Sequence, residues 1–267
     1  MRAVGYKRRE ESGWIKWGRE LLDLIFPPAA KCAGCGRVLA PGEELLCRGC
    51  REAISLLTEP TCGRCGRPLT HPGLCAHCRK EEWAFVRAWP AAIYREPLRE
   101  ILHSFKYGRE TRLAPFLAGL VVARLKAASG VPATPLVVPV PLDPGRLSER
   151  GFNQAELLAR EVAHAFGWPL AIGLLRRTRP TRPQAELAAE ERRENVAHVF
   201  QARTEAAGKV IVLIDDIFTT GATADSASAA LLAAGARKVY VATVAVASSH
   251  PHPHQRGADG ILAEPAV

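Results

Sequence analysis

The sequence lacks long apolar stretches, and it lacks cysteine after residue 78. No run of about 18 apolar residues occurs, which excludes a transmembrane helix. The N-terminal region has no apolar segment ahead of a small-residue cleavage site, so we expect no secretory signal and a cytoplasmic protein. We therefore do not expect the chain to be a disulfide-rich secreted protein.

The eight cysteines all belong to Cys-x-x-Cys pairs, which are Cys32/Cys35, Cys47/Cys50, Cys62/Cys65 and Cys75/Cys78. Two sulfur atoms on one tight turn suit two corners of a tetrahedron, and a second turn supplies the other two. The alternative is a disulfide scaffold, which needs an oxidising compartment. We predict two structural zinc sites of four thiolates each. The spacing leaves open whether consecutive pairs share an ion or whether pairs one and three do.

There is no surplus of acidic residues, because 36 Lys and Arg against 27 Asp and Glu give a formal charge of +9. This charge favours an anionic partner such as a nucleotide, a nucleic acid or a membrane surface. Two zinc ions bound by eight thiolates would lower the net charge to +5. The basic charge by itself is therefore a weak indication of nucleic acid.

Changes in composition divide the chain into four parts. Residues 1–28 have apolar residues at helical spacing, which predicts an amphipathic helix packed on the next domain or on a partner subunit. A helix lying on a membrane surface is the alternative. Residues 29–88 form the predicted double zinc ribbon, residues 89–248 a second domain, and residues 249–267 a disordered tail.

Helical and strand patterns alternate in the second domain. We expect helices over residues 97–120, 153–166 and 224–234, and buried strands over 136–140, 210–214 and 239–247. Strands that alternate with helices at this spacing predict an α/β fold with a mainly parallel sheet and flanking helices.

The segment VIVLIDDIFTTGATADSASAALLAAG, residues 210–235, is typical of a phosphate site. A buried strand ends in Asp215 and Asp216, and a helix follows a loop of small and hydroxyl residues, namely Thr219, Thr220, Gly221, Ala222 and Thr223. Free N–H groups at a helix N-terminus bind phosphate, and paired carboxylates accept hydrogen bonds from ribose hydroxyls. The pattern predicts a ribose 5-phosphate site; an ordinary strand-to-helix turn with an N-cap is the alternative.

The stretch LIDDIFTTGAT resembles the signature with which type I phosphoribosyltransferases bind 5-phosphoribosyl 1-pyrophosphate (PRPP). Segments at 101–109, 138–163 and 183–200 resemble the ComF/GntX family, whose members join a double zinc ribbon to such a domain. The resemblance covers roughly residues 20–248. It implies a type I phosphoribosyltransferase fold, PRPP with Mg²⁺ as ligand, and a homodimer as one possible assembly.

The resemblance also implies roles for individual residues. Asp215 and Asp216 would hold the ribose hydroxyls and, as catalytic residues, stabilise positive charge on the ribose ring, while the loop 219–223 would bind the 5-phosphate. Residues 139–146 look like the pyrophosphate loop. Candidates for binding pyrophosphate or ordering that loop are Lys106, Arg146, Arg150, Asn153 and Gln154. Residues 176–193 take the place of the mobile catalytic loop, although a charge run of this kind is also typical of a solvated surface.

Two functions follow from the resemblance. In the first, the protein binds PRPP and handles single-stranded DNA during natural competence, together with the competence helicase machinery. Trp83, Phe85 and Trp89 would then stack on bases, unless they pack at the domain junction. In the second, the protein is an active Mg²⁺-dependent phosphoribosyltransferase that moves ribose 5-phosphate from PRPP to a small nitrogen acceptor. No residue pattern identifies that acceptor.

Overall fold

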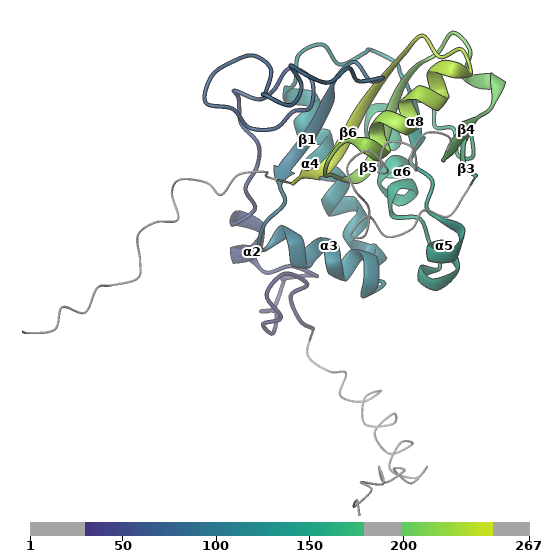
Figure 1. Ribbon diagram of the computed structural model, residues 1–267. Coiled ribbons are helices and arrows are strands. Elements are labelled where there is room, and N and C mark those ends of the chain that lie inside the picture. The colour runs from purple at the N-terminus through teal and green to yellow at the C-terminus, as the bar shows by residue number, and fades with distance from the viewer. Residues whose placement is uncertain (1–29, 179–198, 248–267) are drawn as a thin grey trace, which may run out of the picture.

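The computed structural model describes residues 30–178 and 199–247 (Figure 1). The predicted N-terminal helix, the tail and most of the segment 176–193 lie outside the described residues. Among the described residues, no helix has the length and apolarity needed to cross a bilayer.

The larger domain is built on a four-stranded parallel sheet with the strand order β1-β6-β5-β2. Its strands are β1 (Ala88–Ile93), β2 (Leu136–Pro139), β5 (Val210–Phe218) and β6 (Lys238–Val246). Strands β5 and β6 are mostly aliphatic and buried, as a parallel sheet covered on both faces requires. The predicted α/β fold with a mainly parallel sheet is confirmed.

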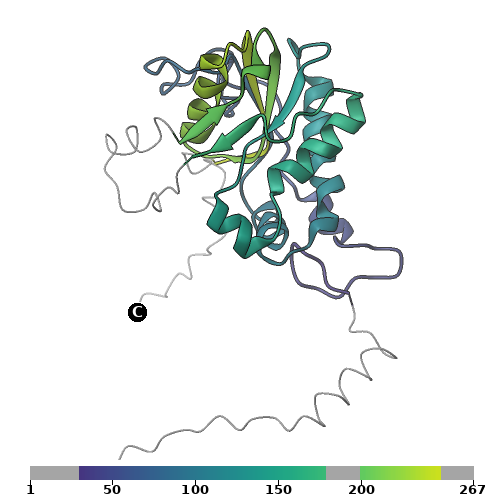
Figure 2. The same cartoon turned by 90° about the vertical axis from the view of Figure 1, so that its right-hand side faces the viewer.

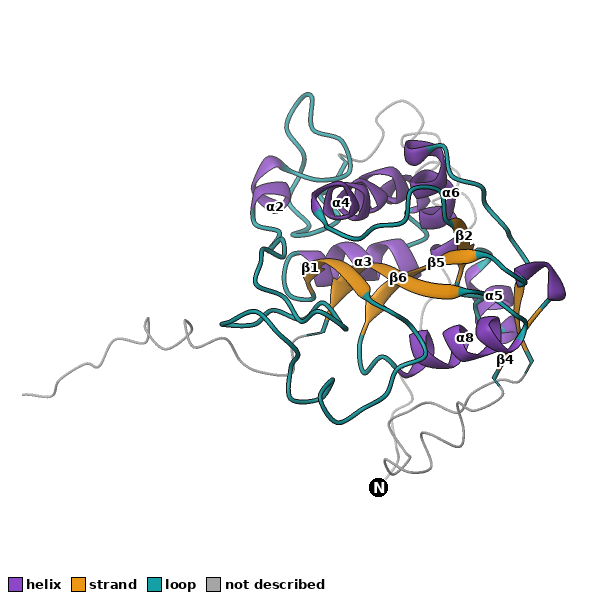
Figure 3. Cartoon of the chain, turned by 90° about the horizontal axis from the view of Figure 1, so that it is seen from above, coloured by secondary structure: helices purple, strands orange, loops and turns teal. Residues whose placement is uncertain are grey.

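Helices cover both faces of this sheet (Figure 3). One face is covered by α4 (Ala114–Ala127) and α6 (Gln154–Phe166). The other is covered by α8 (Ala222–Ala233), against which an antiparallel pair packs, β3 (Leu175–Arg177) with β4 (Phe200–Ala202). Within residues 30–178 and 199–247, the remaining elements are α2 (Arg48–Glu52), α3 (Leu98–Tyr107), α5 (Pro144–Arg150) and the 3-10 turns Thr111–Leu113 and Thr204–Ala206.

Helices α3 and α5 lie beyond the edge of the sheet where the strands end (Figure 1). The purple segment around α2 lies next to α3 in this view and in the perpendicular view of Figure 2. Its cysteines share an apolar cluster with Leu98 and Ile101 of α3, and the Ser104 hydroxyl donates to the Ala33 carbonyl at 3.1 Å. These contacts hold the first four cysteines against α3, next to the end of the sheet.

Two boundaries differ from the sequence-based expectation. The helix expected over 97–120 is interrupted after α3, because Arg109 adopts a left-handed φ of +54° that a right-handed helix cannot contain. The strand expected over 210–214 continues to Phe218, since β6 runs beside it as far as Val246 and supplies the ladder hydrogen bonds. Asp215 and Asp216 therefore lie inside the strand. Strand β1 and the β3–β4 pair had no counterpart in the expectation.

A buried arginine joins the linker between the two cysteine quartets to α4. Only 7% of the Arg124 side chain is exposed, and its Nη2 donates to Glu59 Oε1 at 3.0 Å and to Thr61 Oγ1 at 3.2 Å. Because Thr61 immediately precedes the third cysteine pair, these bonds hold the second quartet against the larger domain.

Replacing Arg124 with alanine should lower the free energy of unfolding by about 2–3 kcal/mol, because the change removes the hydrogen bonds of a buried guanidinium to the buried Thr61 and to Glu59, whose side chain is 58% exposed. The control is Arg48→Ala, which breaks an exposed ion pair with Glu52 (side chains 85% and 62% exposed) and should cost about 0.5 kcal/mol or less. Urea unfolding measures both variants. Equal effects would show that Arg124 has no special part in joining the domains.

Candidate functional site

The eight cysteines gather in two clusters, and within each cluster the four Sγ atoms lie within 4.8 Å of one another. The first cluster is Cys32, Cys35, Cys47 and Cys50, and the second is Cys62, Cys65, Cys75 and Cys78. Consecutive pairs therefore share a site, which settles the order that the spacing left open. All eight cysteines are unbridged, in contrast to a disulfide scaffold.

Both clusters have the donor set that zinc prefers. Backbone N–H groups point at the sulfur atoms: Cys47 N lies 3.3 Å from Cys32 Sγ, and Cys50 N lies 3.3 Å from Cys47 Sγ. In the second cluster Cys75 N lies 3.3 Å from Cys62 Sγ. Such bonds stabilise thiolates, and four thiolates suit a tetrahedral, structural zinc ion with no open position. The clusters are consistent with two structural zinc sites.

We expect two zinc ions per chain, bound independently. A variant in which serine replaces all four cysteines of the first cluster should still bind one ion, because the second cluster is complete without them. The replaced residues are Cys32, Cys35, Cys47 and Cys50. Native mass spectrometry counts the ions directly. Loss of both ions in this variant would contradict the consecutive pairing.

The loop segment 219–223 lies at the end of the sheet, where residues 219–221 join β5 to α8, whereas Ala222 and Thr223, predicted to be loop, are the first two residues of the helix. Thr219 and Thr220 are exposed, and Gly221 is the N-cap of α8 with a left-handed φ of +94°. The first N–H groups of a helix have no intrahelical acceptor, so they present hydrogen-bond donors and the positive end of the helix dipole. A pocket opens at this point, and loop residues Thr219, Gly221 and Thr223 contribute to its lining.

The two adjacent acids face opposite sides of the sheet, because neighbouring strand residues alternate. Asp215 lines the pocket beside the loop, together with Thr243, its register partner on β6. Asp216 faces α3 instead, where its Oδ2 forms an ion pair with the Nζ of Lys106. Burial raises the pKa of Asp215 well above its ordinary value, and the neighbouring charge of Asp216 raises it further.

The Arg177 guanidinium of β3 interacts electrostatically with Asp215. Arg177 is half-buried, and burial lowers the pKa of its guanidinium. Asp143, Arg146 and Asp215 all act on this group electrostatically, so they lie close to it. The sequence placed Arg177 only in a run of arginines. No sequence pattern pointed to Thr243, because it comes next to Asp215 only through the register of β5 and β6.

The predicted residues Lys106, Arg146, Arg150, Asn153 and Gln154 do not belong to the lining of this pocket. Arg150 is buried, donates to the side chain of Gln154, and places its guanidinium carbon 5.0 Å from the centre of the Tyr107 ring. Asn153 caps α6, and its Nδ2 donates to the Val140 carbonyl at 3.0 Å. These three side chains order the segment between β2 and α6.

The aromatic residues singled out in the sequence pack inside the protein. Phe85 and Trp89 are fully buried, and the Trp83 ring lies 5.3 Å from that of Phe85. Of the two roles open to them, packing at the domain junction is confirmed. Tyr107, at the end of α3, is by contrast 65% exposed.

Comparison with known proteins agrees with this architecture. Residues 21–79 match the family model described as a double zinc ribbon domain, and residues 151–263 match the phosphoribosyl transferase domain. The chain is 31% identical over 214 residues to the DNA utilization protein YhgH of Salmonella typhi, covering 79% of this chain and 94% of that protein. This chain belongs to the competence protein F and YhgH family.

Other members of the competence protein F family are similar over nearly as much of the chain. Competence protein F of Haemophilus influenzae is 29% identical over 218 residues, or 79% of this chain and 94% of that protein. Competence protein ComFC of Bacillus subtilis is 28% identical over 72% of this chain and 80% of its own length. The resemblance to the ComF/GntX family is thereby confirmed.

A looser structural likeness links this family member to a glutamine PRPP amidotransferase from B. subtilis. The two chains are 22% identical, with a TM-score of 0.33, over 54% of this chain and 26% of that one. The family assignment rests on the sequence matches alone.

Asp215→Asn should stabilise this member of the competence protein F family at neutral pH. Because the pKa of Asp215 is raised above its ordinary 3.8, the folded state holds the proton longer than the unfolded chain does. Stability is then lost as the pH rises above 3.8, until the folded-state pKa is passed. Asparagine does not ionise, so the variant does not lose this stability. The Tm of the variant minus that of the wild type, measured by scanning calorimetry, should therefore increase from acidic to neutral pH.

Asp216→Asn is the matched control for this prediction. It leaves Lys106, only 17% exposed, without its carboxylate, and should destabilise the protein by about 2–3 kcal/mol. Destabilisation of similar size in both variants would contradict the assignment of opposite environments to the two acids.

Proposed function

We propose that this chain binds PRPP, with Mg²⁺ on the PRPP oxygens, and that it handles single-stranded DNA. The observation that carries the first part is the shared pocket at the N-terminus of α8, lined by both the loop 219–223 and Asp215. A phosphate-binding helix N-terminus next to the Asp215 carboxylate suits a ribose 5-phosphate. The second part is supported by the names of the relatives, which are competence and DNA utilization proteins.

In this proposal the residues around the pocket take different parts. Backbone N–H groups and hydroxyls of the loop 219–223 bind the 5-phosphate, and Asp215 accepts hydrogen bonds from the ribose hydroxyls. Asp216 holds Lys106 at the end of the sheet, where its ammonium group neutralises pyrophosphate. Arg146 and Arg177 add positive charge on the β3 side.

Among the aromatic side chains of the described residues, Tyr107 is the most exposed and so the best placed to meet a DNA base. The Arg150 guanidinium lies 5.0 Å from the Tyr107 ring centre, and the His103 ring lies 4.9 Å away. An aromatic ring stacks on any base, and nearby cations attract the phosphates of the strand. Since Lys106 precedes Tyr107 directly, a strand bound here would pass beside the proposed PRPP site.

An active phosphoribosyltransferase is the second candidate, supported by the electrostatic interaction of Arg177 with Asp215 and by the ion pair of Lys106 with Asp216. In that reaction the bond between C1 of the ribose and the pyrophosphate oxygen breaks, and pyrophosphate leaves with the electron pair. A nitrogen acceptor then forms the new bond to C1 and loses a proton. The cations stabilise the negative charge that gathers on the leaving group.

Fluorescence anisotropy with labelled single-stranded DNA and zinc-loaded protein tests the proposal. We expect micromolar binding at physiological salt that weakens as salt rises and shifts when PRPP and Mg²⁺ are added. Tyr107→Ala should weaken DNA binding about 5- to 30-fold through loss of stacking. Tyr107→Phe keeps the ring and should bind as the wild type does.

The outcomes separate the two candidates. No DNA binding with or without PRPP would overturn the DNA-handling role, and a screen for acceptor-dependent pyrophosphate release would then test the transferase. Unchanged PRPP affinity in a double Asp215→Asn, Asp216→Asn variant would overturn the site assignment itself.

A further inference from the structure

The two zinc ribbons contain copies of one turn. The first is CAGCGR, residues 32–37, and the second is CGRCGR, residues 62–67. In each copy the N–H of the first cysteine donates to the carbonyl of the final arginine at 2.8 Å, and the glycine before that arginine is left-handed, at φ +74° and +70°. Arg37 and Arg67 therefore occupy equivalent positions.

These equivalent arginines bind different partners. Arg37 stays within its own ribbon, where Nη2 lies 2.7 Å from Glu43 Oε1, and its side chain is 45% exposed. Arg67 reaches across to the larger domain, where Nη2 donates to the carbonyl of Thr219 in the phosphate loop. Its guanidinium carbon also lies 5.9 Å from the ring centre of Phe218, the last residue of β5. The same turn thus supplies an arginine that bonds within the first ribbon and an arginine that bonds between the second ribbon and the larger domain.

The segment after the second ribbon covers the N-terminus of α8. A Cβ atom placed on Gly221 would lie only 2.7 Å from the Trp83 ring, so the indole packs directly on the N-cap. The same ring is 5.3 Å from that of His77, inside the ribbon. The next residue, Ala84, donates its N–H to Asp225 Oδ1 at 2.7 Å, in the first turn of α8.

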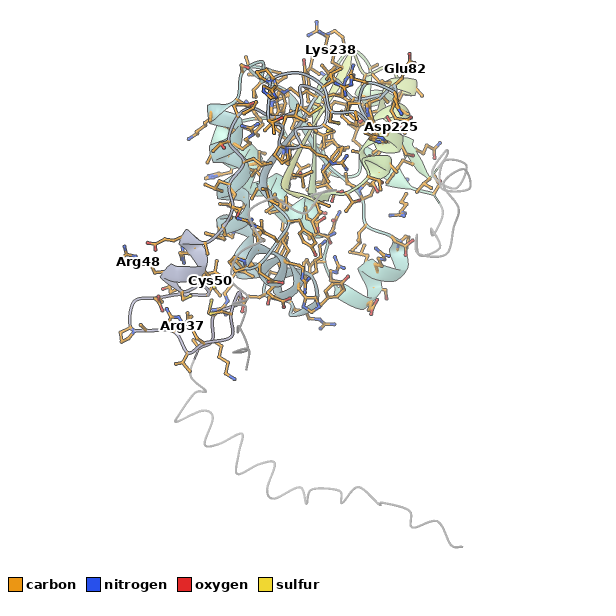
Figure 4. The ribbon with its side chains drawn as sticks, turned by 60° about the vertical axis from the view of Figure 1, so that its left-hand side comes forward. Arg37, Arg48, Cys50, Glu82, Asp225 and Lys238 are labelled. Atoms are coloured by element: carbon orange, nitrogen blue, oxygen red, sulfur yellow. The ribbon has the colours of Figure 1, made fainter. Side chains whose placement is uncertain are left out.

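The first ribbon packs elsewhere, on α3. Figure 4 shows Arg37 beside Cys50, well apart from Asp225 at the start of α8. A Cβ atom on Gly36 would meet nothing within 4 Å, whereas one on Gly66 would lie 2.3 Å from Pro90 Cδ. The second ribbon is therefore seated tightly on β1, next to the loop that it touches.

We propose that the second zinc ribbon positions the phosphate loop through Arg67 and Trp83, so that binding of a phosphate monoester depends on this ribbon and not on the first. Arg67 fixes the Thr219 carbonyl and hence the peptide plane that carries the Thr220 N–H. Trp83 holds Gly221 from above. Donors fixed before the ligand arrives bind it without the cost of ordering the loop.

The proposal rests on the proposed function, because the monoester in question is the 5-phosphate of PRPP. It is tested on the full, zinc-loaded chain by titration calorimetry with ribose 5-phosphate. Arg67→Ala should weaken binding at least ~10-fold, in line with the loss of a charged hydrogen bond. Arg37→Ala, the equivalent change in the first ribbon, should leave the affinity unchanged.

Two further measurements keep the outcomes distinct. Amide hydrogen exchange of residues 219–223 without ligand should speed up in Arg67→Ala and stay at the wild-type rate in Arg37→Ala. Trp83→Phe, which keeps an apolar ring but vacates the space over Gly221, should act in the same direction as Arg67→Ala. These exchange rates report on positioning even where no ligand binds.

A wild type that binds neither ribose 5-phosphate nor PRPP would overturn the proposed function, while the exchange rates would still decide the positioning. A wild type that binds both, together with unchanged affinity and exchange in Arg67→Ala and Trp83→Phe, would overturn the positioning alone. Equal losses in Arg37→Ala and Arg67→Ala would overturn it too, since the first ribbon would then matter as much as the second.

Discussion

The parallel pairing of β5 with β6 is the constraint on which the rest of this molecule depends. It runs from Val210 opposite Lys238 to Phe218 opposite Val246, and it carries two acids to the end of the sheet. Adjacent acids are poor strand formers, and burying a carboxylate is costly. The aliphatic residues earlier in β5 supply the burial that holds the acidic end in place.

This pairing also places the two adjacent acids, Asp215 and Asp216, in different surroundings. Alternation along the strand turns Asp215 toward the pocket and Asp216 toward α3, so the two carboxylates meet different partners. Lys106 forms an ion pair with Asp216, whereas burial raises the pKa of Asp215. A buried carboxyl that weakens the fold is typical of a functional position.

The zinc ribbons show how a repeated element acquires unequal roles. Zinc gives each small segment the rigidity that its few apolar residues cannot supply. The first ribbon packs on α3 through apolar contacts, while the second packs on β1 and contacts Thr219 in the loop after β5. A rigid turn places an arginine more accurately than a mobile loop does, which makes a ribbon a suitable support for a site.

Much of the architecture could be predicted from the sequence, because the signals are local. The spacing of Cys32/Cys35 and its three repeats indicated zinc, and apolar periodicity located the main strands and most helices. The strand, small-residue loop and helix of residues 210–235 located the candidate phosphate site. Each of these patterns lies within a few turns of chain, where backbone geometry alone determines which residues share a face.

The tertiary structure decided the rest, because those contacts join residues far apart in the sequence. Arg67 meets Thr219 across 152 positions, and no local feature distinguishes it from Arg37. The pairing of Lys106 with Asp216 and the opposite orientation of the two acids likewise depend on which helix covers which face. Residue spacing determined what each segment can bind, and packing determined which segments meet to bind it.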